Sequence, residues 1–207
     1  MPKKGQKADN RSFILIIAVI AIALTTIALN SADEESEEAE APIVNETATV
    51  LATEGEWVNF DAPVGQFTVD FPDEPDVEAI EIPLAELEAS IIQNSYTSFD
   101  PLGNLYAVQF ATYPDEIDTS SPDDNLGSAL NGLVSASESN VLLFSELIDY
   151  KDGRALEFSF VNEDDHAMIS GRMILIGQDV YLLMAGYENG AHNEEAYTHF
   201  LDSFTIE

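Results

Sequence analysis

The feature that most constrains the fold is an uncharged apolar segment at residues 13–29, FILIIAVIAIALTTIAL. As an α-helix, these 17 residues would span roughly 25 Å, close to the thickness of the hydrocarbon core of a bilayer. The segment has no polar face, which disfavours a helix in the core of a globular domain. The sequence therefore predicts a helix for the membrane here, and the globular domain must come from the residues that follow.

The charge of the chain changes sign across this segment. Residues 1–12 hold four basic side chains and one acid, a net charge of +3, whereas residues 30–207 hold 38 acids and three basic side chains. Basic residues beside an apolar segment stay in the cytoplasm. We therefore expect a single-pass membrane protein with a basic cytoplasmic end at 1–12, a transmembrane signal anchor at 13–29 and an extracytoplasmic acidic part.

A secretory signal peptide has the same basic and apolar regions, and its cleavage site distinguishes it from an anchor. Thr26-Ile27-Ala28 is a mediocre site of the small-x-small type. Secretion after cleavage therefore stays an alternative to the anchor. The chain contains no cysteine, which excludes a lipoprotein anchor, disulfides and thiolate metal sites.

Residues 30–56 predict an acidic disordered linker. Six of the eight residues from 33 to 40 are acids, which repel one another and resist packing. No sustained hydrophobic period follows before residue 57. We expect one globular domain over residues 57–207, since about 150 residues are enough for a sizeable core.

Alternating apolar residues predict β-strands over most of this domain. Those before the first helix lie at 57–60, 66–71, 77–82, 89–99 and 105–113. Those after it lie at 141–150, 154–162, 167–176 and 180–187. Asp152-Gly153 is a strong hairpin signal between two of these strands.

Two helices are predicted. Leucine spacing indicates one over residues 122–138, with Ser121 as its N-cap and Pro122 at its first position. The other follows Asn193, its expected N-cap. Strands, a helix, four strands and a final helix predict an α+β fold, with helices packed on a central antiparallel sheet.

Four short motifs occur in the order and spacing of a known family. They are FTVDFP at 67–72, GRALEF at 153–158, RMILIG at 172–177 followed by VYLL at 180–183, and FLDSF at 200–204. They resemble motifs of the PsbP-like domains of small exported bacterial proteins, and the resemblance covers residues 57–207. It implies an α/β/α sandwich with a central antiparallel sheet. It does not imply photosystem binding, because the bacterial relatives are mostly of unknown function and the motifs look structural.

The sequence contains no catalytic motif that we recognise. No serine lies in G-x-S-x-G, and the three histidines lack a metal-pair spacing. We therefore expect a non-catalytic binding or accessory module without a cofactor. A hydrolase of unknown type and an envelope stress or structural protein are the alternatives.

The expected partners are the membrane and a protein of the envelope. Nucleic acid is disfavoured, because phosphate binding needs clustered lysine and arginine. A cleft that joins a histidine to convergent carboxylates would favour the hydrolase. An exposed apolar patch on the sheet or beside a helix would favour a protein partner.

Acidic loops offer the oxygen ligands that calcium prefers. The candidate ligands are Asp115, Asp118, Asp123, Asp124, Asp164 and Asp165. His166 follows the last of them, so a metal site with a histidine is conceivable there. No D-x-D-x-D-G loop is present, and simple solvation of these loops is the alternative.

Arg154 and Arg172 are the two arginines of the predicted domain. In surroundings so rich in acids, each is expected to pair with carboxylates across a hairpin. The alternative is a small anion-binding site.

Self-repulsion among the acids predicts that salt stabilises the domain. At about 1 M NaCl the Debye length falls to about 3 Å, which screens most of this repulsion. We expect the melting temperature, followed by circular dichroism, to be higher at about 1 M NaCl than at low salt. A melting temperature that stays constant or falls as salt rises would contradict this expectation.

Overall fold

The computed structural model describes residues 57–84, 89–188 and 192–207. The predicted cytoplasmic end, signal anchor and linker, at 1–12, 13–29 and 30–56, lie outside the described residues. Among the residues that are described, no helix is long and apolar enough to cross a membrane.

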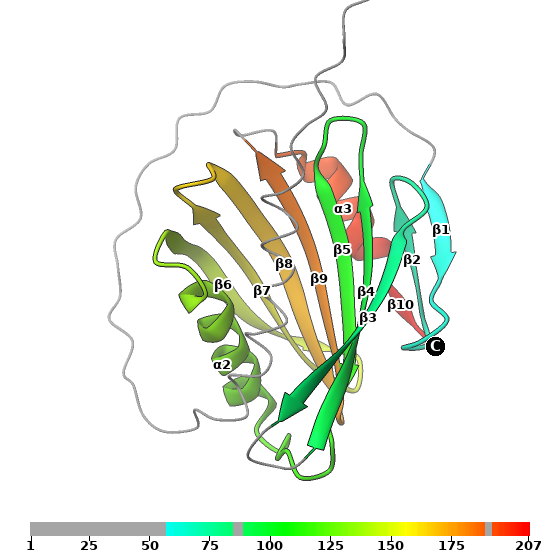
Figure 1. The fold of residues 1–207 in the computed structure, drawn as a ribbon, viewed down its shortest axis with the longest axis vertical. Helices are drawn as coiled ribbons and strands as arrows, with labels where there is room; N and C mark the ends of the chain where they lie inside the picture. The colour runs from blue at the N-terminus through cyan, green and yellow to red at the C-terminus, as the bar shows by residue number, and fades with distance from the viewer. Residues whose placement is uncertain (1–56, 85–88, 189–191) are drawn as a thin grey trace, which may run out of the picture.

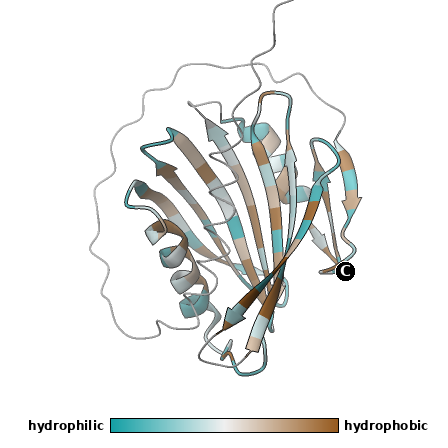
Figure 2. Cartoon of the chain, viewed as in Figure 1, coloured by the Kyte–Doolittle hydropathy of each residue, from teal (hydrophilic) through white to brown (hydrophobic). Residues whose placement is uncertain are grey.

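A seven-stranded antiparallel sheet forms the centre of the domain, with the strand order β3-β4-β5-β9-β8-β7-β6 (Figure 1). Hydrophobic and hydrophilic bands alternate along its strands (Figure 2), as the period of two in the sequence predicts. The strands are β3 (Asp76–Leu84), β4 (Ala89–Phe99), β5 (Leu105–Thr112), β6 (Asn140–Tyr150), β7 (Gly153–Asn162), β8 (Ala167–Ile176) and β9 (Asp179–Glu188).

A smaller sheet brings the two ends of the described domain together. It has the order β1-β2-β10, and both pairings are antiparallel. Its strands are β1 (Val58–Asp61), β2 (Phe67–Phe71) and β10 (Thr205–Ile206). The FTVDFP motif therefore supplies the middle strand of this sheet, with Phe67, Val69 and Phe71 fully buried.

Helix α2 (Pro122–Ser135) covers one face of the large sheet, where it packs mainly on β7, β6 and β8. Its buried face consists of Leu126, Ala129, Leu130 and Leu133. These side chains join Phe158 and Phe160 of β7 in one hydrophobic core.

Helix α3 (Glu194–Ser203) and the small sheet cover the other face. Phe200, Leu201 and Phe204 pack there against a set of buried aromatic side chains of the strands. Two hydrophobic cores thus lie on opposite faces of one sheet, and the expected α+β fold with an antiparallel sheet and packed helices is confirmed.

The helix boundaries depart from the sequence prediction at α2. The helix ends at Ser135 rather than 138, and the Ser121 side chain makes no capping hydrogen bond. Pro122 at the start and the acids of the first turn remain as the helix-starting features. For α3, the Asn193 side chain accepts a hydrogen bond from the Ala196 amide at 3.2 Å, so its predicted N-cap is correct.

Candidate functional site

Strand β6 is an edge strand of the large sheet, and its middle is apolar and exposed. Four consecutive apolar residues and one further leucine are exposed there, each to between 36% and 46%. These residues, which we call the β6 patch, are Val141, Leu142, Leu143, Phe144 and Leu147. An edge strand also leaves backbone N–H and C=O groups without partners in the sheet.

The β6 patch extends over both faces of the sheet. Residues directly opposite one another on paired strands point to the same face. Leu142 is opposite Phe160, in the core beneath α2, whereas Phe144 is opposite Ser159, whose side chain points to the other face. The register shifts between Leu142 and Phe144, so a β-bulge re-aims the side chains at this point. The edge is therefore apolar from either side.

Strand β3, at the opposite edge of the sheet, is protected against pairing. It carries the three acids Asp76, Glu78 and Glu81, and Pro83 lacks an amide donor. Charges, proline and β-bulges are means by which proteins keep an edge strand from adding another strand. Residues 141–145 of β6 contain neither charge nor proline and carry only the β-bulge between Leu142 and Phe144, so the two edges of this sheet differ.

Acids lie at both ends of the β6 patch. At one end, Glu146 and Asp149 lie on β6 before and after Leu147, and both are exposed. At the other end, the Asp164 carboxylate accepts a hydrogen bond from the hydroxyl of Ser139, one residue before β6 begins. Along this edge the surface therefore changes from acidic to apolar and back to acidic.

Arg154 and Arg172, which were expected to pair with carboxylates, are both engaged in ion pairs. Arg154 Nε lies 2.6 Å from Asp123 Oδ1 on α2, and its guanidinium also bonds Asp149 across the β6–β7 hairpin. Hydrogen bonding to Asp123 raises the pKa of Arg154. Arg154 therefore already balances Asp149, whereas Arg172 bonds Glu157, directly opposite on β7.

The calcium candidates stay apart. The carboxylates of Asp115, Asp118, Asp123, Asp124, Asp164 and Asp165 are all exposed on loops or on the first turn of α2. Across the described ranges, no three side chains of the histidine, cysteine, aspartate and glutamate types come together in a way that could hold a metal ion. The calcium site remains a prediction from the sequence.

The histidines lie at separate places. His166 is exposed in the β7–β8 turn with a φ of 52°. His192 Nε2 lies 2.7 Å from Glu194 Oε2, and His199 Nε2 lies 3.0 Å from Asp70 Oδ2, with the Trp57 ring 4.6 Å from the imidazole. His192 and His199 each contact a single carboxylate. Such isolated pairs give no support to a hydrolytic site.

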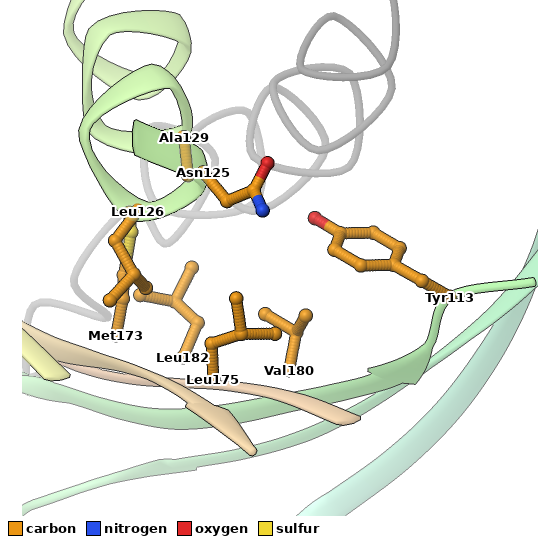
Figure 3. Close-up of a pocket in the computed structure, with 8 residues that line it drawn as sticks. All are labelled: Tyr113, Asn125, Leu126, Ala129, Met173, Leu175, Val180 and Leu182. Atoms are coloured by element: carbon orange, nitrogen blue, oxygen red, sulfur yellow. The ribbon is translucent and has the colours of Figure 1, made fainter. Parts of the chain in front are cut away.

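A small cavity lies between α2 and the sheet, with a volume of about 10 Å³, the space of about one water molecule. Figure 3 shows the Tyr113 hydroxyl and the Asn125 amide facing one another above Leu175, Leu182 and Val180. Burial raises the pKa of Tyr113 to about 12, so its hydroxyl is protonated at neutral pH. The cavity as it stands has no room for a ligand larger than water.

Two buried glutamines of the large sheet were not singled out from the sequence. Gln93 on β4 and Gln109 on β5 are each 1% exposed. Gln109 is directly opposite Leu182, which lines the cavity. Neither side-chain polar atom of Gln109 has a hydrogen-bond partner within the described part of the chain. Strand alternation could have placed both glutamines on the same face as Ile91 and Ala107, and so in the core.

Gln109→Met is expected to stabilise the domain, because a buried amide without partners costs about 1–3 kcal/mol. The exposed Gln66 is the matched control, since Gln66→Met removes no buried polar group. The free energy of unfolding, measured in urea, should rise by about 1 kcal/mol for Gln109→Met and change by less than about 0.5 kcal/mol for the control. Loss of stability in Gln109→Met would mean that the amide has a polar partner in solution.

Comparison with known proteins gives a likeness of fold. No family model matches the sequence, and no curated protein does. The solution structure of PsbP from the cyanobacterium Synechocystis sp. PCC 6803 is similar with a TM-score of 0.48 and 9% identity, over 78% of this chain and 98% of that one. A protein of unknown function from Pseudomonas aeruginosa, PA94, is similar with a TM-score of 0.44 and 11% identity, over 74% of this chain and 99% of that one. PsbP is also the family that the four sequence motifs resemble.

Proposed function

We propose that the chain is a non-catalytic binding module, held outside the cytoplasm by the segment at 13–29, and that it binds a protein partner through the β6 patch. The observation that carries the proposal is the exposed apolar surface of an edge strand without protective charges or proline at its centre. An exposed apolar patch of this kind is typical of a protein interface.

The placement outside the cytoplasm rests on the sequence alone. The net charge of +3 before the apolar segment favours a cytoplasmic N-terminus. A flexible acidic stalk at 30–56 would then project the domain away from the bilayer. Cleavage of the segment and release of the domain is the alternative form of this proposal.

Binding is favoured over hydrolysis because the arginines and His199 are engaged in contacts with carboxylates of the same chain. Arg154 bonds both Asp123 and Asp149, Arg172 bonds Glu157, and His199 contacts Asp70. The β6 patch, in contrast, combines apolar side chains with an open strand edge, and a partner would cover both.

The proposal is tested by photo-crosslinking from two positions of the full chain in its native membranes. A benzophenone amino acid replaces Phe144 in the β6 patch or, as the matched control, Ile92 on β4, an exposed apolar residue at 61%. We expect one defined crosslinked product from position 144 and none from position 92, both in the membrane fraction. Equal products from both positions, or none from 144, would contradict binding through β6. Recovery in the cytoplasmic fraction would contradict the anchor.

A further inference from the structure

The chemistry of the β6 edge indicates which kind of partner it takes. The edge offers three things in sequence: acids near Ser139, the uncharged residues 141–145, and then Glu146 and Asp149. A complementary segment must bring apolar side chains to the middle and positive charge to both ends. Because no other strand of the described residues pairs with the outer side of β6, an extended segment can also hydrogen-bond there as an added strand.

Charge decides between a foreign segment and a second copy of this chain. Each copy carries a net charge of −32, so two copies that approach edge to edge bring like charges together. Two of the domain's few basic residues, Arg154 and Arg172, are already bonded to carboxylates of their own chain. A second copy therefore has little positive charge to place against Glu146, and Asp149 is already bonded to Arg154 of its own chain.

The hairpin that holds β6 also suits it to receive a strand. β6 pairs with β7 from Asn140 opposite Asn162 to Tyr150 opposite Gly153, with the register shift between Leu142 and Phe144 as the one irregularity. Its inner side is thus fixed by a long ladder and by the bond of Asp149 to Arg154. The strand is preorganised as a template, so a partner has to order only itself.

We propose that the β6 edge binds an extended, basic and apolar segment of another protein by strand addition, as the eighth strand of the large sheet. This inference rests on the proposed binding role of the β6 patch and specifies its partner. Lysine or arginine at both ends of the segment meets the acids at the ends of the patch, and alternate apolar side chains contact Leu142 and Phe144 from the two faces of the sheet.

The test uses three synthetic peptides and the detergent-solubilised full chain, with binding measured by fluorescence anisotropy. The probe peptide is Lys-Arg-Val-Thr-Val-Ile-Val-Arg-Lys. In the first control, glutamate replaces every lysine and arginine. In the second, proline replaces the central valine and removes a strand hydrogen bond while the charge is kept. We expect the probe to bind at least about tenfold more tightly than either control, and more weakly as salt rises.

Two variants locate the binding. Phe144→Lys adds a positive charge to the exposed middle of β6 and should weaken the probe by at least about tenfold. Ile92→Lys, the matched control on β4, should leave the affinity unchanged. Both positions are exposed, and equal melting temperatures would establish that both variants fold.

The outcomes separate this inference from the proposed function. Equal binding of the proline peptide would overturn strand addition, and equal binding of the glutamate peptide would overturn charge complementarity. Equal weakening by Ile92→Lys would place the binding elsewhere. A dimer of the full chain that Phe144→Lys dissociates would make a second copy the occupant and overturn the inference. A crosslink from position 144 without binding of the probe would leave the proposed function standing and this inference wrong.

Discussion

An open β-sheet has two edge strands, and whether each edge is blocked or open to another strand determines where this domain can bind a partner. The outermost strands leave backbone groups unpaired, so a chain must either block them or give them to a partner. Here β3 is blocked by acids and Pro83, whereas β6 carries an uncharged apolar run. The faces of the same sheet are treated differently, since α2 covers one and α3 with the small sheet covers the other.

The acidity of the chain acts on this edge in two ways. A surface with few basic residues keeps copies of the domain apart, which protects an apolar edge strand from self-association. It also sets a preference for positively charged partners. Arg154 and Arg172 could otherwise repel a basic partner. Both are neutralised by carboxylates of their own chain, which strengthens this preference. The excess of acidic residues therefore also makes the domain selective for basic partners.

Local sequence patterns predicted most helices and strands, but they could not predict which strands distant in the sequence pair with one another. The alternation of Phe67, Val69 and Phe71 and the Asn193 cap are local features, and the structure has both. The two-residue strand β10 pairs with Thr68 and Phe67, far away in the sequence, and no local pattern indicates such a pairing. Ser121 had the residue type of a cap but makes no capping bond, because its backbone conformation is not the extended one found at Asn193.

The sequence predicted what kind of surface would bind a partner, but it did not predict where in the fold that surface lies. An exposed apolar patch was expected to favour a protein partner, but the run at 141–145 has the pattern of a buried strand. Whether such a strand lies in the middle or at the edge depends on strand order, which is set by contacts across the whole domain. The same limit applies to Gln109, a polar residue in a strand whose burial depends on what packs above it.

Hydrogen exchange of individual backbone amides tests the central claim most directly, because it reports where a strand is added. The account predicts that the basic probe peptide slows exchange at β6 amides on the side away from β7 and leaves β3, the other edge, unchanged. Slowed exchange at β3, or binding of the peptide without any change along β6, would contradict it.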